Sequence, residues 1–250
     1  MQENLHDKVR IILTETSNRQ YALPVKPWLF YQEWHNVLLF HWAVDAEMIR
    51  GFIPYPMELD LFEGKAYISV IGFGVSQFRT SMTGPVPFIS DFKELNVRTY
   101  VSFNGIKGVY FFSLHVDKFL ASWGARLFYQ LPYRKASLNL SKSILYCESR
   151  HDHKVKLLVN YRDLSGFLDK TALDLWLTER HAFYQTNGNR LYRCDIHHVE
   201  WPLQKAVIYS GRIGVRIMGP SEEIVLTDMP QSAQFAKKLE VLFWNRIRVY

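Results

Sequence analysis

The segment ELNVRTYVSFNGIKGVYFFSLHVD, residues 94–117, alternates apolar and polar residues with the two-residue period of a β-strand. Its centre, NGIKG, has glycines where a hairpin turn needs positive φ angles, so we predict a β-hairpin connected by the five residues 104–108. One face of the first strand is apolar, and the other carries a polar row, which consists of Glu94, Asn96, Arg98, Tyr100 and Ser102.

The polar row has two interpretations. On a sheet with one face in water, such alternation needs no function. The second strand of the hairpin, however, is largely apolar on both faces, which indicates that Glu94 and Arg98 lie in a partly enclosed place. A charge buried there without a partner would cost several kcal/mol, so we expect these two residues to pair with each other. A structural ion pair and a pocket-lining carboxylate are both compatible with this pattern.

The rest of the chain reads as many strands with few helices. Helices are predicted at residues 45–54, 118–130 and 171–185, and from Pro230 to the C-terminus, where Phe235, Leu239 and Phe243 lie on one helical face. Glycines inside a long predicted strand suggest bends that curl the sheet. Because short loops join the strands without repeated βαβ units, we predict an α+β fold with a mainly antiparallel, curled or barrel-like sheet.

Length and terminal sequences set the expected domain organisation. A chain of 250 residues is compatible with one domain. Residues 1–27 are mostly polar, so we predict an N-terminal arm at 1–27 and a single domain at 28–250 that ends in the C-terminal helix. The sequence shows no secretion signal and no apolar run long enough to span a bilayer, so we expect a cytoplasmic protein without membrane contact.

Charge and motifs exclude several functions. Thirty Lys and Arg against 24 Asp and Glu give a net charge of +6, but the basic residues are scattered and no nucleic-acid-binding motif occurs. The cysteines, Cys147 and Cys194, do not make a disulfide framework, and the GxSxG and GxGxxG motifs are absent. We therefore expect no nucleic-acid partner and no cofactor. The C-terminal helix could contact a second copy of the chain, as a homo-oligomer, or dock within its own chain.

The chain has nine histidines, a residue type that often binds metal ions. His197 and His198 are adjacent, and neighbouring residues on a strand point to opposite faces. His151 and His153 fall in a predicted turn, and no HExxH motif occurs. The sequence therefore predicts no metal site.

Lysine chemistry is a further candidate. The stretch LPYRKAS places Arg134 beside Lys135, just after the proline that ends a predicted helix. A lysine next to another cation in a dry pocket has a lowered pKa and can form a Schiff base with a carbonyl substrate. The alternative is an exposed basic loop.

Several long motifs, in order, resemble those of a known family. They are FHWAVDAEMIRGFIPYPMELDLFEGKAYISVIGF, the hairpin of residues 94–117, ARLFYQLPYRKA, LTERHAFY and HHVEWPL, and together they span roughly residues 28–210. The chain resembles the YqjF-like uncharacterised bacterial proteins, a family placed in the acetoacetate-decarboxylase-like superfamily. The resemblance implies that fold, and no established activity comes with it.

The acetoacetate decarboxylases themselves offer a more detailed resemblance. They carry a similar VSFNGxKGxY hairpin, with a carboxylate eight residues before its serine, and Glu94 precedes Ser102 by the same spacing. The resemblance implies a cone-like β-barrel with Glu94 facing its cavity. Those enzymes also have two consecutive lysines directly after the helix-ending proline, the first of which forms the imine. Here Tyr133 and Arg134 follow Pro132, and a slip of one residue on a strand turns a side chain to the opposite face.

These observations predict a barrel pocket that binds a small organic acid or carbonyl compound without Schiff-base decarboxylation. Arg98, Tyr100, Tyr133 and Arg134 are the expected ligand-binding residues. The alternative is a decarboxylase-like enzyme that acts on a keto acid through Lys135 as the amine and Glu94 as general acid or base.

Overall fold

The computed structural model describes residues 4–84, 91–118, 131, 133–149, 154–220 and 222–250. Its helices are α1 (Leu5–Thr14), α2 (Ala46–Arg50) and α4 (Ala172–Thr178). Its strands are β1 (Phe30–Val44), β2 (Glu58–Leu59), β3 (Ala66–Thr80), β4 (Phe92–Phe103), β5 (Ile106–Val116), β6 (Tyr133–Lys135), β7 (Ser137–Leu140), β8 (Ile144–Ser149), β9 (Val155–Asp163), β10 (Ala182–Asn187), β11 (Arg190–His197), β12 (Gln204–Met218), β13 (Glu223–Leu226), β14 (Ser232–Phe243) and β15 (Ile247–Arg248). Among the described residues, no helix is both long and apolar enough to cross a lipid bilayer.

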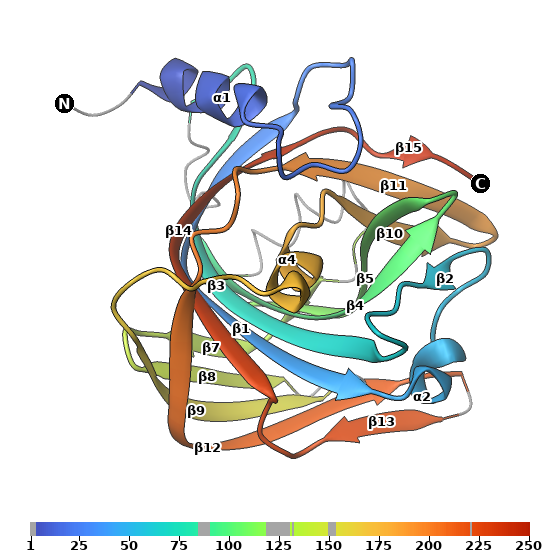
Figure 1. Ribbon diagram of the computed structural model, residues 1–250, viewed down its shortest axis with the longest axis vertical. Coiled ribbons are helices and arrows are strands. Elements are labelled where there is room, and N and C mark those ends of the chain that lie inside the picture. The colour runs from blue at the N-terminus through green and yellow to red at the C-terminus, as the bar shows by residue number, and fades with distance from the viewer. Residues whose placement is uncertain (1–3, 85–90, 119–130, 132, 150–153, 221) are drawn as a thin grey trace.

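The strands form one curled sheet in the order β15-β11-β10-β5-β4-β3-β1-β14-β12-β9-β8-β7 (Figure 1). Because β11 also pairs with β14, the strands from β11 through β5, β4 and β3 to β14 close into a cone-like ring. The pairings are antiparallel except that β5 runs parallel to β6 and to β10. The predicted α+β fold with a mainly antiparallel curled sheet is confirmed.

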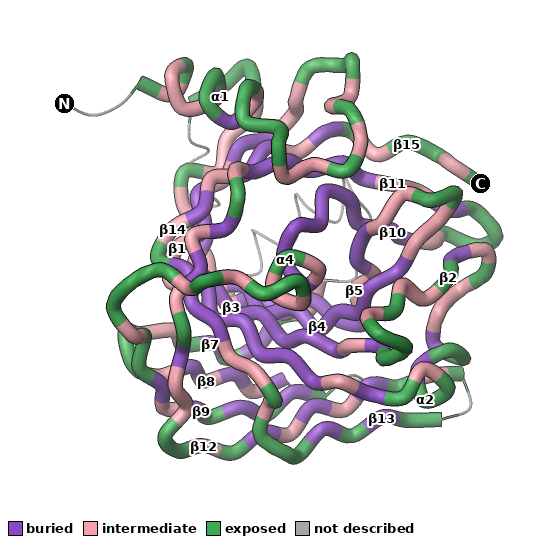
Figure 2. The backbone as a smooth tube through the Cα atoms, in the orientation of Figure 1, coloured by how far each residue is buried: buried purple, intermediate pink, exposed green. Residues whose placement is uncertain are grey.

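Strands β1, β3 and β4 separate two hydrophobic cores and are buried along most of their length (Figure 2). The outer core lies between these strands and β7, β8, β9, β12 and β13, and it includes Leu38, Phe40, Val70, Leu95, Leu145 and Leu157. The inner core lies within the ring and includes Val37, Leu39, Ile71, Phe73, Tyr100 and Phe183. Burial on both faces explains why the second half of β1, residues 37–44, is apolar except for His41 and does not alternate.

The predicted hairpin is confirmed as β4 and β5, but its turn is shorter than predicted. Phe103 pairs directly with Ile106, so the connection is the two residues Asn104 and Gly105. Both have positive φ angles, 49° and 77°, and this combination gives a turn whose twist matches that of the flanking strands. The residues after Gly105 therefore continue as β5.

Two helix predictions are wrong in part or in full. The C-terminal segment is a strand, β14, which pairs with β1, and not a helix. Phe235, Leu239 and Phe243 recur every four residues, a spacing that places side chains on one face of a strand as well as of a helix. The predicted helix of residues 171–185 ends at Thr178, and its second half begins β10. The helix predicted at 118–130 lies almost entirely outside the described residues.

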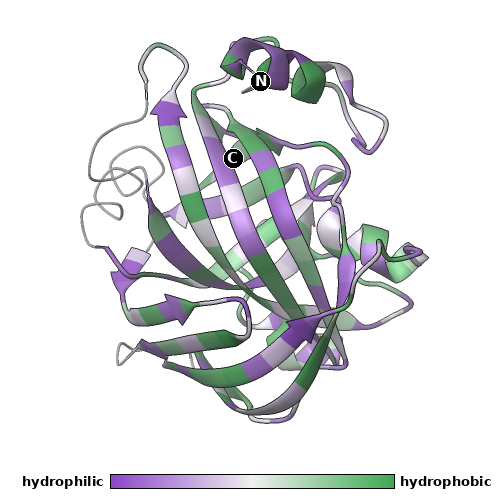
Figure 3. Cartoon of the chain, turned by 90° about the vertical axis from the view of Figure 1, so that its left-hand side faces the viewer, coloured by the Kyte–Doolittle hydropathy of each residue, from purple (hydrophilic) through white to green (hydrophobic). Residues whose placement is uncertain are grey.

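The N-terminal segment forms α1, which lies at one end of the sheet and carries both hydrophobic and hydrophilic residues (Figures 1 and 3). Asn4 caps the helix, and the buried Val9 and Ile12 pack with Tyr31, Leu242 and Trp244. Helix α1, within the predicted arm of residues 1–27, therefore packs against β1 and the end of β14 through an apolar contact.

Candidate functional site

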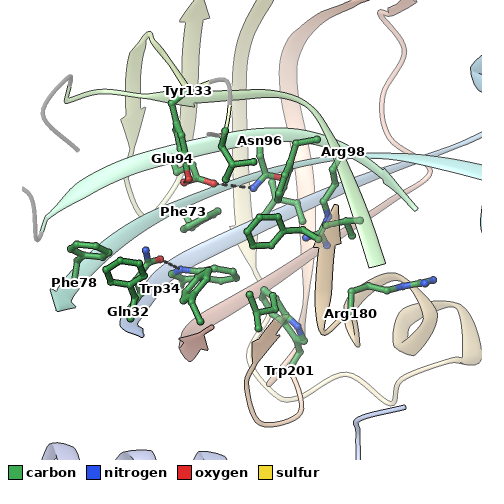
Figure 4. Close-up of a pocket in the computed structure, with 18 residues that line it drawn as sticks. Gln32, Trp34, Phe73, Phe78, Glu94, Asn96, Arg98, Tyr133, Arg180 and Trp201 are labelled. Carbon is green, nitrogen blue, oxygen red and sulfur yellow. Dashed lines mark hydrogen bonds between the residues drawn. The ribbon is translucent and has the colours of Figure 1, made fainter. Parts of the chain in front are cut away.

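The inner core contains a cavity of about 80 Å³ on the ring side of β4 (Figure 4). Its wall is mostly apolar and includes the aromatic residues Phe30, Trp34, Phe73, Phe78, Phe111 and Phe183. A few polar residues also line it, namely Gln32, Glu94, Asn96, Arg98, Tyr133, Arg180 and Trp201. An apolar cavity with a few converging polar groups is the usual form of a small-molecule site.

Strand geometry places the polar groups. Alternation along β4 directs Glu94, Asn96 and Arg98 to the inner face, whereas Leu95 and Val97 enter the outer core. Tyr133 reaches the same place because β6 runs parallel to β5, with Tyr133 opposite Leu114. Polar residues from two strands that are distant in the sequence are thereby brought together.

Glu94 is the acidic group of the cavity. Its carboxyl group accepts hydrogen bonds from Tyr133 Oη at 2.9 Å and from Asn96 Nδ2 at 3.3 Å. Burial raises the pKa of Glu94 to about 7, against the opposing effect of these two hydrogen bonds. At neutral pH this residue is therefore divided between its neutral and charged forms and can give up or take a proton.

Arg98 is the basic group on the far side of the cavity from Glu94 (Figure 4). Arg98 is 7% exposed, and its Nη2 donates one long hydrogen bond, of 3.4 Å, to Leu177 O. Its Nε is buried without a hydrogen-bond partner, and no carboxylate of the described residues lies within ion-pair distance. Arg98 therefore offers the cavity a positive charge that has no counter-ion among the described residues.

The ion pair predicted between Glu94 and Arg98 does not form in the described structure. Strand residues rise about 3.3 Å each, so side chains four residues apart begin roughly 13 Å from each other. Glu94 is instead held by Asn96 and Tyr133. The two charges face one cavity but stand at different places on its wall.

The other polar groups of this wall were not identified from the sequence. Arg180, directly after α4, is paired with Asp60 and lies over the Trp176 ring at 4.4 Å. Trp201 has a buried indole N–H for which the described part of the chain supplies no hydrogen-bond acceptor. Arg180 was not recognised as a cavity residue because it lies within the helix predicted at 171–185. Nothing in the sequence around Trp201 marks that residue as part of a cavity.

The remaining predicted site residues lie outside the cavity lining. Tyr100 is fully buried, and its hydroxyl is bonded to Ser69 Oγ at 2.7 Å. Arg134 is partly buried and Lys135 is exposed at the end of β6. Lys135 starts roughly 7 Å beyond Tyr133 along the strand, and it is not among the residues that line the cavity.

Comparison with known proteins identifies relatives. Residues 31–233 match the DUF2071 family of uncharacterised conserved proteins. The chain is 38% identical over 232 residues to the uncharacterised protein YqjF of Bacillus subtilis (strain 168). The aligned region covers 90% of this chain and 95% of that protein.

Solved structures show the same fold at low sequence identity. Acetoacetate decarboxylase from Legionella pneumophila matches with a TM-score of 0.59 at 14% identity, covering 100% of this chain and 98% of that one. The enduracididine biosynthesis enzyme MppR complexed with pyruvate matches with a TM-score of 0.55 at 15% identity, covering 93% of each chain. The chain therefore belongs to the DUF2071 family, and its fold is that of the acetoacetate-decarboxylase-like enzymes.

Proposed function

We propose that the cavity binds a small organic acid or carbonyl compound, with Arg98 as the anchor for a carboxylate, and that it does so without forming a Schiff base. The observation that carries this proposal is the buried guanidinium of Arg98, which has no anionic partner among the described residues. A buried charge without a counter-ion is costly, and a bound carboxylate removes that cost through charge-assisted hydrogen bonds.

Cavity size limits the ligand. An apolar cavity of roughly 150 Å³ accommodates benzene, so about 80 Å³ suits a molecule of only a few non-hydrogen atoms. MppR, a solved structure with the same fold, is complexed with pyruvate, a short carboxylate. Both facts support a short organic acid as the ligand.

The opposite side of the cavity supplies a proton-bearing pair, Glu94 and Tyr133. A ligand whose carboxylate meets Arg98 can present a carbonyl or hydroxyl oxygen to this pair. No lysine of the described residues lines the cavity, and Lys135 is exposed. These positions favour non-covalent binding over the alternative of a keto-acid decarboxylase that uses Lys135 as its amine.

A second candidate function, an enzyme that transfers a proton with Glu94, is favoured by one observation. Burial brings the pKa of Glu94 to about 7, where a general acid or base is most effective. Such an enzyme would act on a carbonyl compound or keto acid bound at Arg98, and it would need no imine.

Calorimetric titration with acetate, pyruvate and acetoacetate tests the proposal. We expect Arg98→Gln to weaken binding by roughly 10- to 100-fold, because a charged hydrogen bond to the ligand is lost. The same change at the exposed Arg190 is the matched control and should leave affinity unchanged. Equal affinities for Arg98→Gln and wild type would refute the anchor.

Borohydride reduction in the presence of each keto acid, followed by peptide mass spectrometry, tests the absence of an imine. We expect no adduct on any lysine. A stoichiometric adduct on Lys135 would instead establish the decarboxylase-like alternative.

A further inference from the structure

A second buried polar cluster lies next to the cavity wall. Arg180 lines the cavity, whereas the residues on either side of it, Glu179 and His181, gather with His198 away from the cavity lining. We call these three residues the Glu179 cluster. They are 8%, 2% and 1% exposed, and one ligand atom from each lies within 4.8 Å of the others.

The spacing of the cluster fits a metal ion. Glu179 Oε2 lies 4.0 Å from His181 Nε2 and 4.0 Å from His198 Nδ1. Ligand atoms around a tetrahedral zinc ion, with bonds of about 2.0–2.1 Å, are roughly 3.3 Å apart. Small side-chain movements therefore close the site, and two imidazoles with one carboxylate form a known zinc ligand set.

The histidine nitrogens that would bind the metal already have hydrogen-bond partners. The two nitrogens that face Glu179 are held by main-chain oxygens, His181 Nε2 by Asn18 O at 3.2 Å and His198 Nδ1 by Val199 O at 2.8 Å. A metal ion on both nitrogens would displace their protons, so Asn18 O could become a ligand and Val199 O would lose its donor.

His197 supplies a partner for the other nitrogen of His181. Its Nδ1 lies 3.5 Å from His181 Nδ1, and its ring also interacts with the main chain of Ile12 and Glu15. A metal-binding imidazole usually donates its second N–H to a neighbouring acceptor. With metal on His181 Nε2, the proton on Nδ1 would be donated to His197, whose own proton would then be on Nε2.

We propose that Glu179, His181 and His198 bind a divalent transition-metal ion of the zinc type, with the main-chain oxygen of Asn18 as a fourth ligand. This departs from the prediction of no metal site, because the ligands come from three separate segments and no local spacing marks them. Arg19, a buried cation near the cluster, is directed to Tyr21 O and Ile196 O and lies 3.5 Å from Asp195, so a carboxylate offsets its charge.

Metal at this site would stiffen the cavity wall. Glu179 Oε1 accepts a hydrogen bond from Trp201 N at 3.2 Å, and the His198 ring meets the Trp201 ring edge to face with centroids 5.6 Å apart. Arg180, between two of the ligands, also lines the cavity. The metal proposal does not depend on the ligand proposed for the cavity.

The test uses the full chain, stripped with EDTA, dialysed and titrated with ZnCl₂ by calorimetry, with bound zinc then counted by elemental analysis. We expect one zinc ion per chain and at least a tenfold weaker affinity in Glu179→Gln and in His198→Gln. His6→Gln, at an exposed histidine outside the cluster, is the matched control and should bind as the wild type does.

Cobalt(II) provides a measurement that needs no variant. Wild-type protein loaded with Co²⁺ should show the intense visible absorption bands of four-coordinate cobalt, and zinc should displace them. Absence of those bands, no zinc uptake, or uptake that both folded variants retain would overturn the proposal. Circular dichroism establishes whether each variant is folded, and if neither folds, the cobalt spectrum of the wild type decides.

Discussion

At the scale of single residues, the cavity combines two groups that folding alone does not favour. Glu94 is a buried carboxyl group whose ionisation burial opposes, and Arg98 is a buried cation without a carboxylate partner in the described structure. Natural proteins usually accept such costs where a ligand or a reaction repays them. Strand alternation predicted that both residues lie on one face. The prediction that they form an ion pair was wrong, because residues four apart on a strand are too far from each other.

The pKa of Glu94 predicts how stability depends on pH. The folded state holds this proton up to about pH 7, whereas the unfolded chain releases it near 4.5, so the folded state binds more protons in between. The free energy of unfolding should therefore fall by roughly 2 kcal/mol from pH 5 to pH 8 on account of this one group.

Glu94→Gln removes that fall, because the amide cannot ionise. Urea unfolding at several pH values should give a flatter profile for this variant, with little change at pH 5 and a gain in stability at pH 8. The exposed Glu222→Gln is the control and should keep the wild-type slope. A Glu94→Gln profile parallel to the wild type would contradict the raised pKa.

At the scale of elements, the sequence predicted the strands of the ring better than the segments that close it. The 94–117 hairpin was recognisable because Asn104 and Gly105 allow only a narrow range of turns. β14 was not recognisable, because Phe235, Leu239 and Phe243 satisfy helical and strand periodicity equally. Only its pairing with β1 distinguishes the two, and that contact is remote in the sequence.

Two adjacent residues of helix α1, one buried and one exposed, test whether the helix packs on the sheet as described. Ile12 is 1% exposed in the contact with β1 and β14, whereas Ile11 is 42% exposed. Ile12→Ala should destabilise the protein by about 2–4 kcal/mol through lost burial and the cavity left behind, and Ile11→Ala by less than about 1 kcal/mol. Thermal and urea unfolding measure both, and equal effects would mean that α1 is not docked as described.

At the scale of the whole molecule, the ring closes through short pairings. β5 and β10 share two residue pairs, Val109 with Phe183 and Tyr110 with Tyr184. Gly108 stands at this junction, and a Cβ atom added there would lie 2.7 Å from Ala182 O and 2.8 Å from the Tyr184 ring. The close approach of the two strands therefore requires glycine.

Gly108→Ala should push β10 away from β5 and cost about 1–3 kcal/mol, the usual effect of overpacking. It should also weaken binding in the cavity, because Val109 and Phe183 line it. Gly51→Ala is the control, since an added Cβ there meets nothing within 4 Å. Unfolding curves and ligand titration measure the two effects, and a Gly108→Ala variant as stable as the control would show that the strands can part without cost.

The sheet shared by two cores has a consequence for how this fold can change. Neighbouring residues such as Leu38 and Leu39 belong to different cores, so substitutions in the inner core need not disturb the packing of the outer one. The outer core can hold the molecule together while the wall of the cavity is altered. Such a division lets a lineage exchange one small ligand for another, or gain and lose a reaction, without first having to become more stable.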